Sequence, residues 1–427
     1  MRISIIGTGY VGLVSAAGFS EKGHVVTCVD VVKDKIDMIN SGRSPIYEKG
    51  LDAVLQKNAG KSIIATNDLT GAVMNSEVTF VCVGTPSKPD GSFDRTYVEK
   101  ATEDIGKTLS GKKTYHTVVF KITLLPGTTY EKLIPLLEKH SGKKAGRDFG
   151  VATNPEFLRE GIALEDVMNP DRIIIGGLDE RSSDSVEKLY NGYNSPVIKT
   201  DITTAEMIKY SSNAFLAMKI SFINEIGNIC KRKGVNVYDV AVGMGLDHRI
   251  APYFLNAGLG WGGSCFPKDL RALIYEARNI GYEPVLLDAA LEVNKKLPHL
   301  LVEMARNKTG SLKDKKIAVL GLAFKRDTDD TRDSQSFLVI EELLEEGAKI
   351  CAYDPKAEKN AKAFFRERIE YSPTVNEALK DANLALLLTD WKEFENIDFE
   401  RMKNKIVIDG RNILKKRENI DYGGLHW

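Results

Sequence analysis

The chain has 427 residues, which is too long for one domain and suits two or three. Hydrophobic residues make up 43% and charged residues 28%, a composition that excludes a disordered chain. Because 59 basic and 59 acidic side chains cancel, a protein that binds nucleic acid through bulk positive charge is excluded as well.

The N-terminal run of residues 3–20 carries no charge, but four glycines interrupt it. A secretory signal or a membrane span needs a longer unbroken apolar stretch, so we expect a soluble protein without a membrane partner. The cysteines are odd in number and form no C-x-x-C pair, which disfavours disulfides and zinc and favours the cytoplasm.

Buried strands are predicted at residues 2–6 and 24–30, with a helix from about residue 11 to 22 between them. The alternation continues with strand-like runs and with helical patterns between them. The later strands are expected at 78–83, 115–121, 149–153, 172–176 and 196–199, and two of the helices at 97–109 and 129–140. This alternation predicts a parallel, doubly wound sheet over residues 1–200.

A long helix is predicted next. Thr203 and Glu206 have the spacing of a capping box, and Gly234 is the expected stop. The roughly 30 residues between them contain one glycine, Gly227, and would span about 45 Å. Apolar residues at mostly three- or four-residue steps predict one buried stripe: Met207, Phe215, Met218, Phe222, Ile226 and Ile229. We interpret the helix as a spine between two domains and a candidate dimer surface; a core helix of one domain is nearly as consistent.

A second alternation of strands and helices begins at residue 315 and predicts a smaller parallel-sheet domain over residues 311–427, with 201–300 as a central helical region. Both halves run from a strand and a glycine through a helix to a strand that ends in aspartate, Asp30 or Asp354. We interpret this as repeated architecture and not as a repeated cofactor site. The predicted fold class is α/β, with two doubly wound parallel-sheet (Rossmann-like) domains joined by a long central helix.

The sequence between the first strand and the first helix has the pattern G-x-G-x-x-G, formed by Gly7, Gly9 and Gly12, and Asp30 ends the next strand. The glycines allow a tight turn and the approach of a pyrophosphate to a helix N-terminus. Asp30 is expected to accept hydrogen bonds from ribose hydroxyls, and no arginine follows it to hold a 2′-phosphate. We therefore predict an NAD-binding domain. The second glycine cluster, residues 321–325, lacks the motif, and the residues alone leave open whether it holds a nucleotide.

Cys265 lies in the segment GWGGSCFPKD, just before a helix that Pro267 can open as its first residue. A thiol at a helix N-terminus beside Lys268 gains stabilisation of its thiolate. A packed cysteine in a glycine-rich turn is nearly as consistent with these residues. An NAD site and a thiolate together indicate oxidation of an alcohol to an acid through a thiohemiacetal and a thioester, followed by hydrolysis. The histidines form no ligand-spaced pair, so no metal is expected.

Several longer motifs are chemically unusual: GTGYVG at 7–12, GRSPIYEKGL at 42–51, VGTPSKPDGSFD at 83–94, NPEFLREG at 154–161, NPDRIIIGG at 169–177, AEMIKYSSNAFLAMKISFINE at 205–225, GWGGSCFPKDLRAL at 260–273, GLAFKRDTDDTRDS at 321–334 and DGRN at 409–412. Through them the chain resembles the UDP-glucose/GDP-mannose dehydrogenase family over nearly its whole length. The resemblance implies an N-terminal NAD domain, a central dimerisation region and a C-terminal domain that binds the nucleotide sugar.

The resemblance also implies catalytic roles. Cys265 matches the family's nucleophile and Asp269 its partner in activating water. Lys209 matches a lysine that stabilises oxyanions at the sugar C6, with the Asn213 amide one helical turn away. Acidic side chains that line substrate and cofactor are matched by Glu156 and Glu160, and a threonine that positions water by Thr123.

The binding residues implied by the resemblance fall into two sets. The cofactor set is Gly7, Gly9, Tyr10, Val11, Gly12, Asp30, Lys35, Thr85, Pro86, Thr123, Glu160 and Arg332. The substrate set is Glu156, Phe157, Leu158, Arg159, Glu160, Lys209, Asn213, Arg249, Phe254, Leu255, Asn256, Gly258, Gly262, Lys268, Phe324, Lys325 and Arg411. The chain departs from the family's common residues at Ile122, Leu125 and Trp261, and Trp261 would add bulk near the sugar.

The activity implied is the NAD-dependent, four-electron oxidation of UDP-glucose to UDP-glucuronate without free aldehyde, by a homodimer or higher homo-oligomer. The same chemistry on GDP-mannose or a UDP-N-acetylhexosamine is one alternative. A β-hydroxyacid dehydrogenase, which removes one hydride per turnover, is a second. A non-catalytic NAD-sensing scaffold is a third, although a scaffold has no need for Cys265, Lys209 and Asp269 together.

Overall fold

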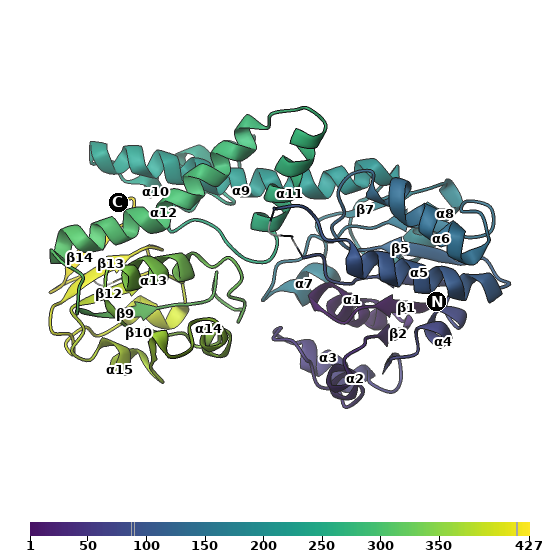
Figure 1. Ribbon diagram of the computed structural model, residues 1–427, viewed down its shortest axis with the longest axis horizontal. Helices are drawn as coiled ribbons and strands as arrows, with labels where there is room; N and C mark the ends of the chain where they lie inside the picture. The colour runs from purple at the N-terminus through teal and green to yellow at the C-terminus, as the bar shows by residue number, and fades with distance from the viewer. Residues whose placement is uncertain (87, 89, 416) are drawn as a thin grey trace. The chain divides into compact units, whose positions relative to one another are not determined.

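The computed structural model describes residues 1–427 except 87, 89 and 416. The chain divides into two units, Met1–Ser212 and Asn213–Trp427, and each unit contains its own sheet with helices around it (Figure 1). The predicted fold class is confirmed, with the long helix α9 (Ile202–Lys233) between the two sheets in the chain.

The first unit contains an eight-stranded sheet in the order β3-β2-β1-β4-β5-β6-β7-β8. The strands are β1 (Arg2–Ile6), β2 (Val25–Val29), β3 (Ile63–Thr66), β4 (Val78–Val81), β5 (Thr117–Phe120), β6 (Gly150–Thr153), β7 (Ile173–Gly177) and β8 (Val197–Thr200). Neighbouring strands are parallel except β6 and β7, which pair antiparallel. The first six strands have the order of a dinucleotide-binding sheet. In such a sheet the chain adds strands on one side of β1 and then, from β4 on, on its other side.

Helices cover both faces of this sheet, so its strands are apolar on both sides. Ile5 of β1 packs under the helices of one face, and the adjacent Ile6 packs under those of the other. The first face carries α1 (Tyr10–Glu21), α3 (Leu51–Asn58) and α7 (Ala163–Met168), and the second carries α4 (Leu69–Met74), α5 (Thr96–Gly111) and α6 (Ile134–Ser141). The other helical segments are α2 (Lys33–Asn40), α8 (Glu180–Glu187), the π-helical turn Thr129–Leu133 and the 3₁₀ turn Lys188–Tyr190.

The predicted capping box of α9 is wrong. The helix is capped by Asp201, whose carboxylate accepts hydrogen bonds from the Thr204 N–H at 2.9 Å and the Thr204 hydroxyl at 2.6 Å. Glu206 instead accepts from the backbone and side chain of the segment 127–129. An aspartate one position before the helix satisfies the free N–H groups, so the glutamate is available for a tertiary contact.

The predicted buried stripe of α9 is confirmed only in part: Met218 and Ile226 are half-buried against hydrophobic clusters of the second unit. Met207, Phe215, Phe222 and Ile229 are between 43% and 57% exposed. The packed side of the helix carries small residues such as Ala214 and Ala217 together with large ones such as Tyr210 and Ile223. The outer face therefore carries part of the large apolar residues of this helix, and the packed face carries the rest.

The second unit begins with the rest of α9 and continues with α10 (Val237–Gly245), α11 (Phe266–Asn279) and α12 (Val285–Thr309). Its six-stranded sheet is parallel throughout, in the order β11-β10-β9-β12-β13-β14. The strands are β9 (Lys316–Leu320), β10 (Lys349–Tyr353), β11 (Glu370–Tyr371), β12 (Leu384–Leu387), β13 (Ile406–Asp409) and β14 (Asp421–Gly424), and the helices are α13 (Gln335–Glu345), α14 (Glu358–Phe365) and α15 (Val375–Leu379). Helices α12 and α13 pack against each other (Figure 1).

Asp354 follows β10 in the second sheet as Asp30 follows β2 in the first. Its buried carboxylate accepts hydrogen bonds from four backbone N–H groups and from the Trp391 indole. Both oxygens are therefore used inside the unit. Among the described residues, no helix is long and apolar enough to cross a membrane.

Candidate active site

The glycine turn lies between β1 and α1 and has the geometry that the motif predicts. Gly7 has a φ of 98°, which favours glycine, and a Cβ on it would lie 2.7 Å from the Cys82 carbonyl oxygen. A Cβ on Gly12 would overlap the carbonyl oxygen of Gly7. Gly9 caps α1 without a side chain, so the first N–H groups of the helix face a space open to an anion.

Asp30 lies beside this turn. One carboxylate oxygen accepts from the Thr8 N–H at 2.9 Å and the Thr8 hydroxyl at 2.5 Å, and the other accepts from the Val32 N–H at 3.0 Å. Burial raises the pKa of Asp30, but these donors and the Lys35 ammonium group, 3.9 Å away, hold it below its usual value. An ionised acceptor next to the turn fits the ribose of NAD, and the glycine turn fits the pyrophosphate.

The remaining cofactor residues are distributed over both units. Tyr10 and Val11 form the first turn of α1, Thr85 and Pro86 follow β4, and Thr123 is buried after β5. These positions share the carboxyl edge of the first sheet with the glycine turn. Arg332 belongs to the second unit, where its guanidinium group pairs with Asp330 at 2.6 Å.

Glu156 and Lys209 form a buried ion pair in the first unit. The Lys209 Nζ lies 3.0 Å from a Glu156 oxygen, and the two side chains are 4% and 7% exposed. Burial raises the pKa of Glu156, but Lys209, the Leu158 N–H at 2.6 Å and the more distant Lys121 lower it below the usual value. The carboxylate is therefore ionised.

Lys121 is a buried residue of this region that the sequence analysis did not single out. Its Nζ donates to the Asn154 side-chain oxygen at 2.9 Å and to the Tyr190 hydroxyl at 3.1 Å. Burial lowers the pKa of Lys121 to about 8. Lys121, Lys209 and Glu156 together carry an excess of one positive charge when all are ionised. The available signal was a single lysine at the end of an apolar strand, two residues before Thr123.

Aromatic and polar contacts hold the segment that follows Glu156. The Arg172 guanidinium group lies 3.8 Å from the centre of the Phe157 ring, and the Lys209 Nζ lies 5.3 Å from it. Arg159 binds Asp166 through its backbone N–H at 2.8 Å and through its guanidinium group. Leu158 and Glu160 of the same segment are half-buried.

Cys265 is the N-cap residue of α11, and it is the one of the five cysteines that is not buried. The helix begins at Phe266. Pro267 is therefore its second residue, whereas the sequence analysis expected it to be the first. The thiol lies at the positive end of a 14-residue helix, a position that stabilises a thiolate. Cys265 is therefore a chemically suitable nucleophile.

Asp269 lies one helical turn after Cys265 and is 1% exposed. One of its oxygens accepts from the Asn213 amide at 2.6 Å, and the other binds the Lys268 ammonium group. Lys268, which was expected to stabilise the thiolate, thus makes an ion pair with Asp269. The second unit therefore joins Asp269, Lys268 and Asn213 in one cluster, with Cys265 one helical turn before Asp269.

The expected sugar-binding residues of the second unit lie mainly in two segments that pack together, residues 254–262 and 324–334. A Cβ on Gly262 would overlap the carbonyl oxygen of Asp333, and the Gly263 N–H donates to the Arg332 carbonyl at 2.9 Å. Phe254 has a φ of 63°, Leu255 and Gly258 are buried, and Asn256 is exposed. Phe324 and Lys325 are half-buried after β9, and the exposed Arg249 pairs with Asp247 at 2.6 Å.

Trp261 lies in the core of the second unit. It is 4% exposed, its indole N–H donates to the Ser221 hydroxyl at 2.9 Å, and it packs with Ala214, Ala217 and Leu270. The bulk that was expected near the sugar is therefore accommodated against α9.

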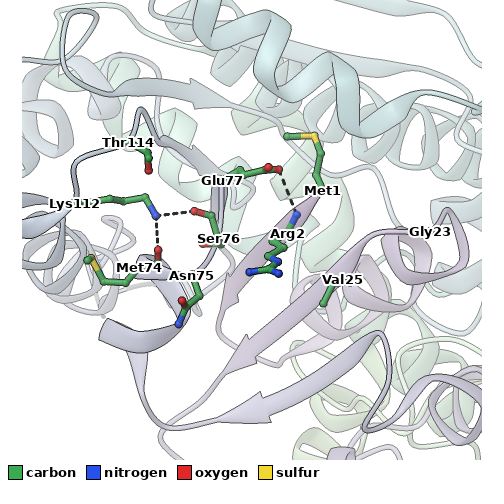
Figure 2. A pocket seen from close by; sticks show the side chains of 10 residues that line it. All are labelled: Met1, Arg2, Gly23, Val25, Met74, Asn75, Ser76, Glu77, Lys112 and Thr114. Carbon is green, nitrogen blue, oxygen red and sulfur yellow. Dashed lines mark hydrogen bonds between the residues drawn. The ribbon is translucent and has the colours of Figure 1, made fainter.

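Two further features lie outside the candidate site. A cavity of about 470 Å³ lies at the amino ends of β1 and β2, at the opposite edge from the glycine turn. Figure 2 shows the Lys112 ammonium group there, directed at the carbonyl groups of Met74 and Ser76. Within the described parts of the chain, no cluster of three or more His, Cys, Asp or Glu side chains could hold a metal ion.

Comparisons with known proteins give one consistent result. Three models of the UDP-glucose/GDP-mannose dehydrogenase family match in sequence: the NAD binding domain at residues 1–194, the central domain at 203–296 and the UDP binding domain at 318–416.

The sequence is 45% identical to a UDP-glucose 6-dehydrogenase of Haloferax volcanii, with 100% of both chains covered. It is 43% identical to a GDP-mannose 6-dehydrogenase of Pseudomonas aeruginosa, with 84% of this chain and 82% of that one covered. A solved UDP-glucose dehydrogenase from Pyrobaculum islandicum superposes with a TM-score of 0.95 at 40% identity, covering 100% of this chain and 97% of the other.

Proposed function

Because the chain belongs to the UDP-glucose/GDP-mannose dehydrogenase family and binds NAD, we propose that it oxidises UDP-glucose to UDP-glucuronate. The chemistry rests on one observation, the half-buried Cys265 at the N-terminus of α11 with Asp269 one turn away. The choice of substrate is supported by UDP-glucose 6-dehydrogenases that are 41–45% identical along almost the whole chain.

We propose the following roles for the residues. NAD held at the glycine turn accepts one hydride from C6 in each of the two oxidations. The Cys265 thiolate attacks the C6 aldehyde that the first oxidation produces, and the resulting oxyanion is stabilised by the Lys209 ammonium group and the Asn213 amide. The second oxidation leaves a thioester on Cys265.

Hydrolysis of the thioester completes the reaction. Asp269, with Glu156 and Thr123, orients a water molecule and removes its proton as the oxygen attacks the thioester carbon. The Cys265 thiolate leaves, and the product is a C6 carboxylate. For each UDP-glucose, one water is consumed and two NAD molecules are reduced to NADH, which balances the four electrons.

The proposal is tested by the NADH formed per sugar nucleotide consumed. We expect two NADH per UDP-glucose and little reaction with UDP-galactose, UDP-N-acetylhexosamines or GDP-mannose. Two NADH on another sugar would keep the mechanism and change the substrate; GDP-mannose is the second candidate because of the 43% identity to a GDP-mannose 6-dehydrogenase. One NADH would indicate a single oxidation, as in a β-hydroxyacid dehydrogenase, and no reaction would favour a scaffold.

Cys265→Ser is expected to lower UDP-glucuronate formation by about a thousandfold or more, because serine is a poor nucleophile without a base. Cys230→Ser is the matched control, since Cys230 is buried in the same unit and has no proposed role. Undiminished UDP-glucuronate formation by Cys265→Ser would contradict the covalent mechanism.

We further propose that the protein forms a homodimer through α9. Phe215, Phe222 and Ile229 recur every seven residues on its outer face and are about half exposed. A row of large apolar side chains in water is typical of a protein–protein interface.

A further inference from the structure

Residues 257–261 form a buried loop whose backbone is held by side chains from many parts of the second unit. The Tyr238 hydroxyl donates to the Ala257 carbonyl at 2.6 Å, and the Gly258 N–H donates to the Asn224 side chain at 2.7 Å. The other contacts are His426 to the Gly258 carbonyl at 3.0 Å, Arg411 to the Gly260 carbonyl at 2.7 Å, and Asn294 and Gln335 to the backbone of Trp261 at 2.8–2.9 Å.

A buried segment outside any helix or strand must satisfy its backbone groups in some other way. Here six side chains from α9, α10, α12, α13, the segment after β13 and the C-terminal segment do so. The backbone conformation of this loop is therefore fixed before any ligand binds, which lowers the entropy cost of binding.

His426 is the most distant of these residues in the sequence, 168 positions from Gly258, and it lies beyond residue 416, where the match to the UDP binding domain ends. Its side chain is fully buried. Because a carbonyl oxygen can only accept, the imidazole Nε2 carries the proton and donates. Burial lowers the pKa of His426 to about 4, so the ring is neutral at physiological pH.

The position of His426 also explains the one glycine inside α9. A Cβ on Gly227 would lie 2.8 Å from the Cβ and Cγ atoms of His426, so only glycine leaves room for the imidazole. Lys231, one turn later, donates to the carbonyl groups of Gly424 at 2.6 Å and Leu425 at 3.2 Å. The C-terminal segment is thus attached to α9 through the two residues before His426, and His426 itself packs against Gly227.

We propose that His426 is a positioning residue for nucleotide-sugar binding, which acts by fixing the Gly258 carbonyl and thereby the loop 257–261. This inference rests on the proposed function, in which residues 254–262 hold the UDP-sugar. The hydrogen bond of His426 goes to the loop and not to a proposed catalytic or NAD-binding residue, so its loss should weaken binding of the nucleotide and leave the chemical steps and NAD binding intact.

Gly227→Ala is the sharpest test, because it removes no hydrogen-bonding group and replaces a helical glycine with the best helix former. We expect it to displace the imidazole, to raise the dissociation constant for UDP by about tenfold and the KM for UDP-glucose by a similar factor, and to leave kcat and the KM for NAD unchanged. Gly243→Ala in α10 is the matched control, since a Cβ there meets nothing within 4 Å.

Two substitutions at His426 separate the hydrogen bond from packing. His426→Phe fills the site but cannot donate to the Gly258 carbonyl, and should weaken UDP binding as Gly227→Ala does. His426→Gln can still donate and should recover most of the wild-type affinity. A solely structural role would instead make all three variants lose thermal stability with an unchanged affinity for UDP in the folded fraction.

The measurement is a calorimetric titration of the full chain with UDP, combined with steady-state kinetics on UDP-glucose. Wild-type protein that neither binds UDP nor reduces NAD with any sugar nucleotide would refute the proposed function. Wild-type protein that binds UDP, with Gly227→Ala and His426→Phe binding it equally well, would refute the role of His426 alone.

Discussion

Two lysines affect the pKa of Glu156, one through a direct ion pair and the other through space. Lys209 pairs with it directly, whereas Lys121 binds Asn154 and Tyr190 and acts on the carboxylate through space. Both positive charges lower the pKa of Glu156, and both are nearly inaccessible to water. The charge state of this carboxylate therefore depends on a residue that makes no hydrogen bond to it in the structure.

Lys121→Met should raise the pKa of Glu156, because a cation that stabilises its ionised form is removed. The acidic limb of the pH profile of kcat/KM for UDP-glucose should then move to higher pH. Lys112→Met is the matched control: Lys112 is also buried and binds three backbone carbonyl groups, but it lies at the other end of β5. Both variants should lose stability, and only Lys121→Met should shift the limb. An equal shift in both would contradict the electrostatic explanation.

Individual residues also mark the limit of what sequence could predict about the site. The turn around Gly7 and the thiol of Cys265 follow from local motifs, since each depends on a strand end or a helix start a few residues away. The contacts of Lys121 with Asn154 and Tyr190, and of His426 with Gly258, join residues from 33 to 168 positions apart. No local pattern contains that information.

Among the secondary structure elements, Glu206 connects α9 to the helical segment that begins at Thr129. Its carboxylate accepts from the Gly127 N–H at 2.7 Å and from the Thr129 N–H and hydroxyl at 3.2 and 2.6 Å. Burial raises the pKa of Glu206 to about 7, against the opposing effect of these donors. Residues 127–129 lie a few positions after Thr123 in the chain. The hydrogen bonds of Glu206 therefore also fix the start of the helical segment that follows Thr123.

The raised pKa of Glu206 predicts a pH-dependent stability. Between pH 4.5 and 7 the folded state binds more protons at this group than the unfolded state, so its contribution to stability falls as pH rises through that window. The change is about 3 kcal/mol at most. Glu206→Gln should remove this pH dependence, so the urea unfolding midpoint of the wild-type protein should fall relative to that of the variant as pH rises from 4.5 to 7. Parallel midpoint curves would contradict the raised pKa.

The elements also differ in how well the sequence predicted them. Interior strands such as β1, β4 and β5 are covered by helices on both faces and read as continuous apolar runs, so their ends were predicted to within two residues. The three strands that were missed, β3, β11 and β14, are all at sheet edges. An edge strand needs no continuous apolar run: Ile64 of β3 is 44% exposed, and β14 is Asp-Tyr-Gly-Gly.

For the whole molecule, the outer face of α9 predicts the state of association. A double variant Phe215→Glu and Phe222→Glu would place charges in the proposed interface and should raise the dimer dissociation constant by at least about a hundredfold. Sedimentation velocity should then show a monomer that still binds UDP. Leu338→Glu is the control. Leu338 is 50% exposed on α13, outside the proposed α9 interface, so its replacement should leave association unchanged. A dimer in both variants would place the interface elsewhere.

The balanced charge of the chain affects how strongly the binding of its ligands should depend on ionic strength. Both NAD and a UDP-sugar carry a pyrophosphate, and the sequence has 59 charges of each sign. Binding should therefore depend on local groups such as the α1 N-terminus, and should change less with ionic strength than that of a protein with a large basic patch.

The two aspartates at equivalent strand ends have a consequence for protein engineering. Topology alone would make the second sheet an apparent template for an additional dinucleotide pocket. Asp354, however, is already saturated by five donors, four of them main-chain amides. Every substitution except proline keeps the main-chain amide, so grafting such a pocket there would require the loops after β9 and β10 to be rebuilt. The hydrogen bonds of this one carboxylate thus make the second sheet a poor starting point for such a pocket.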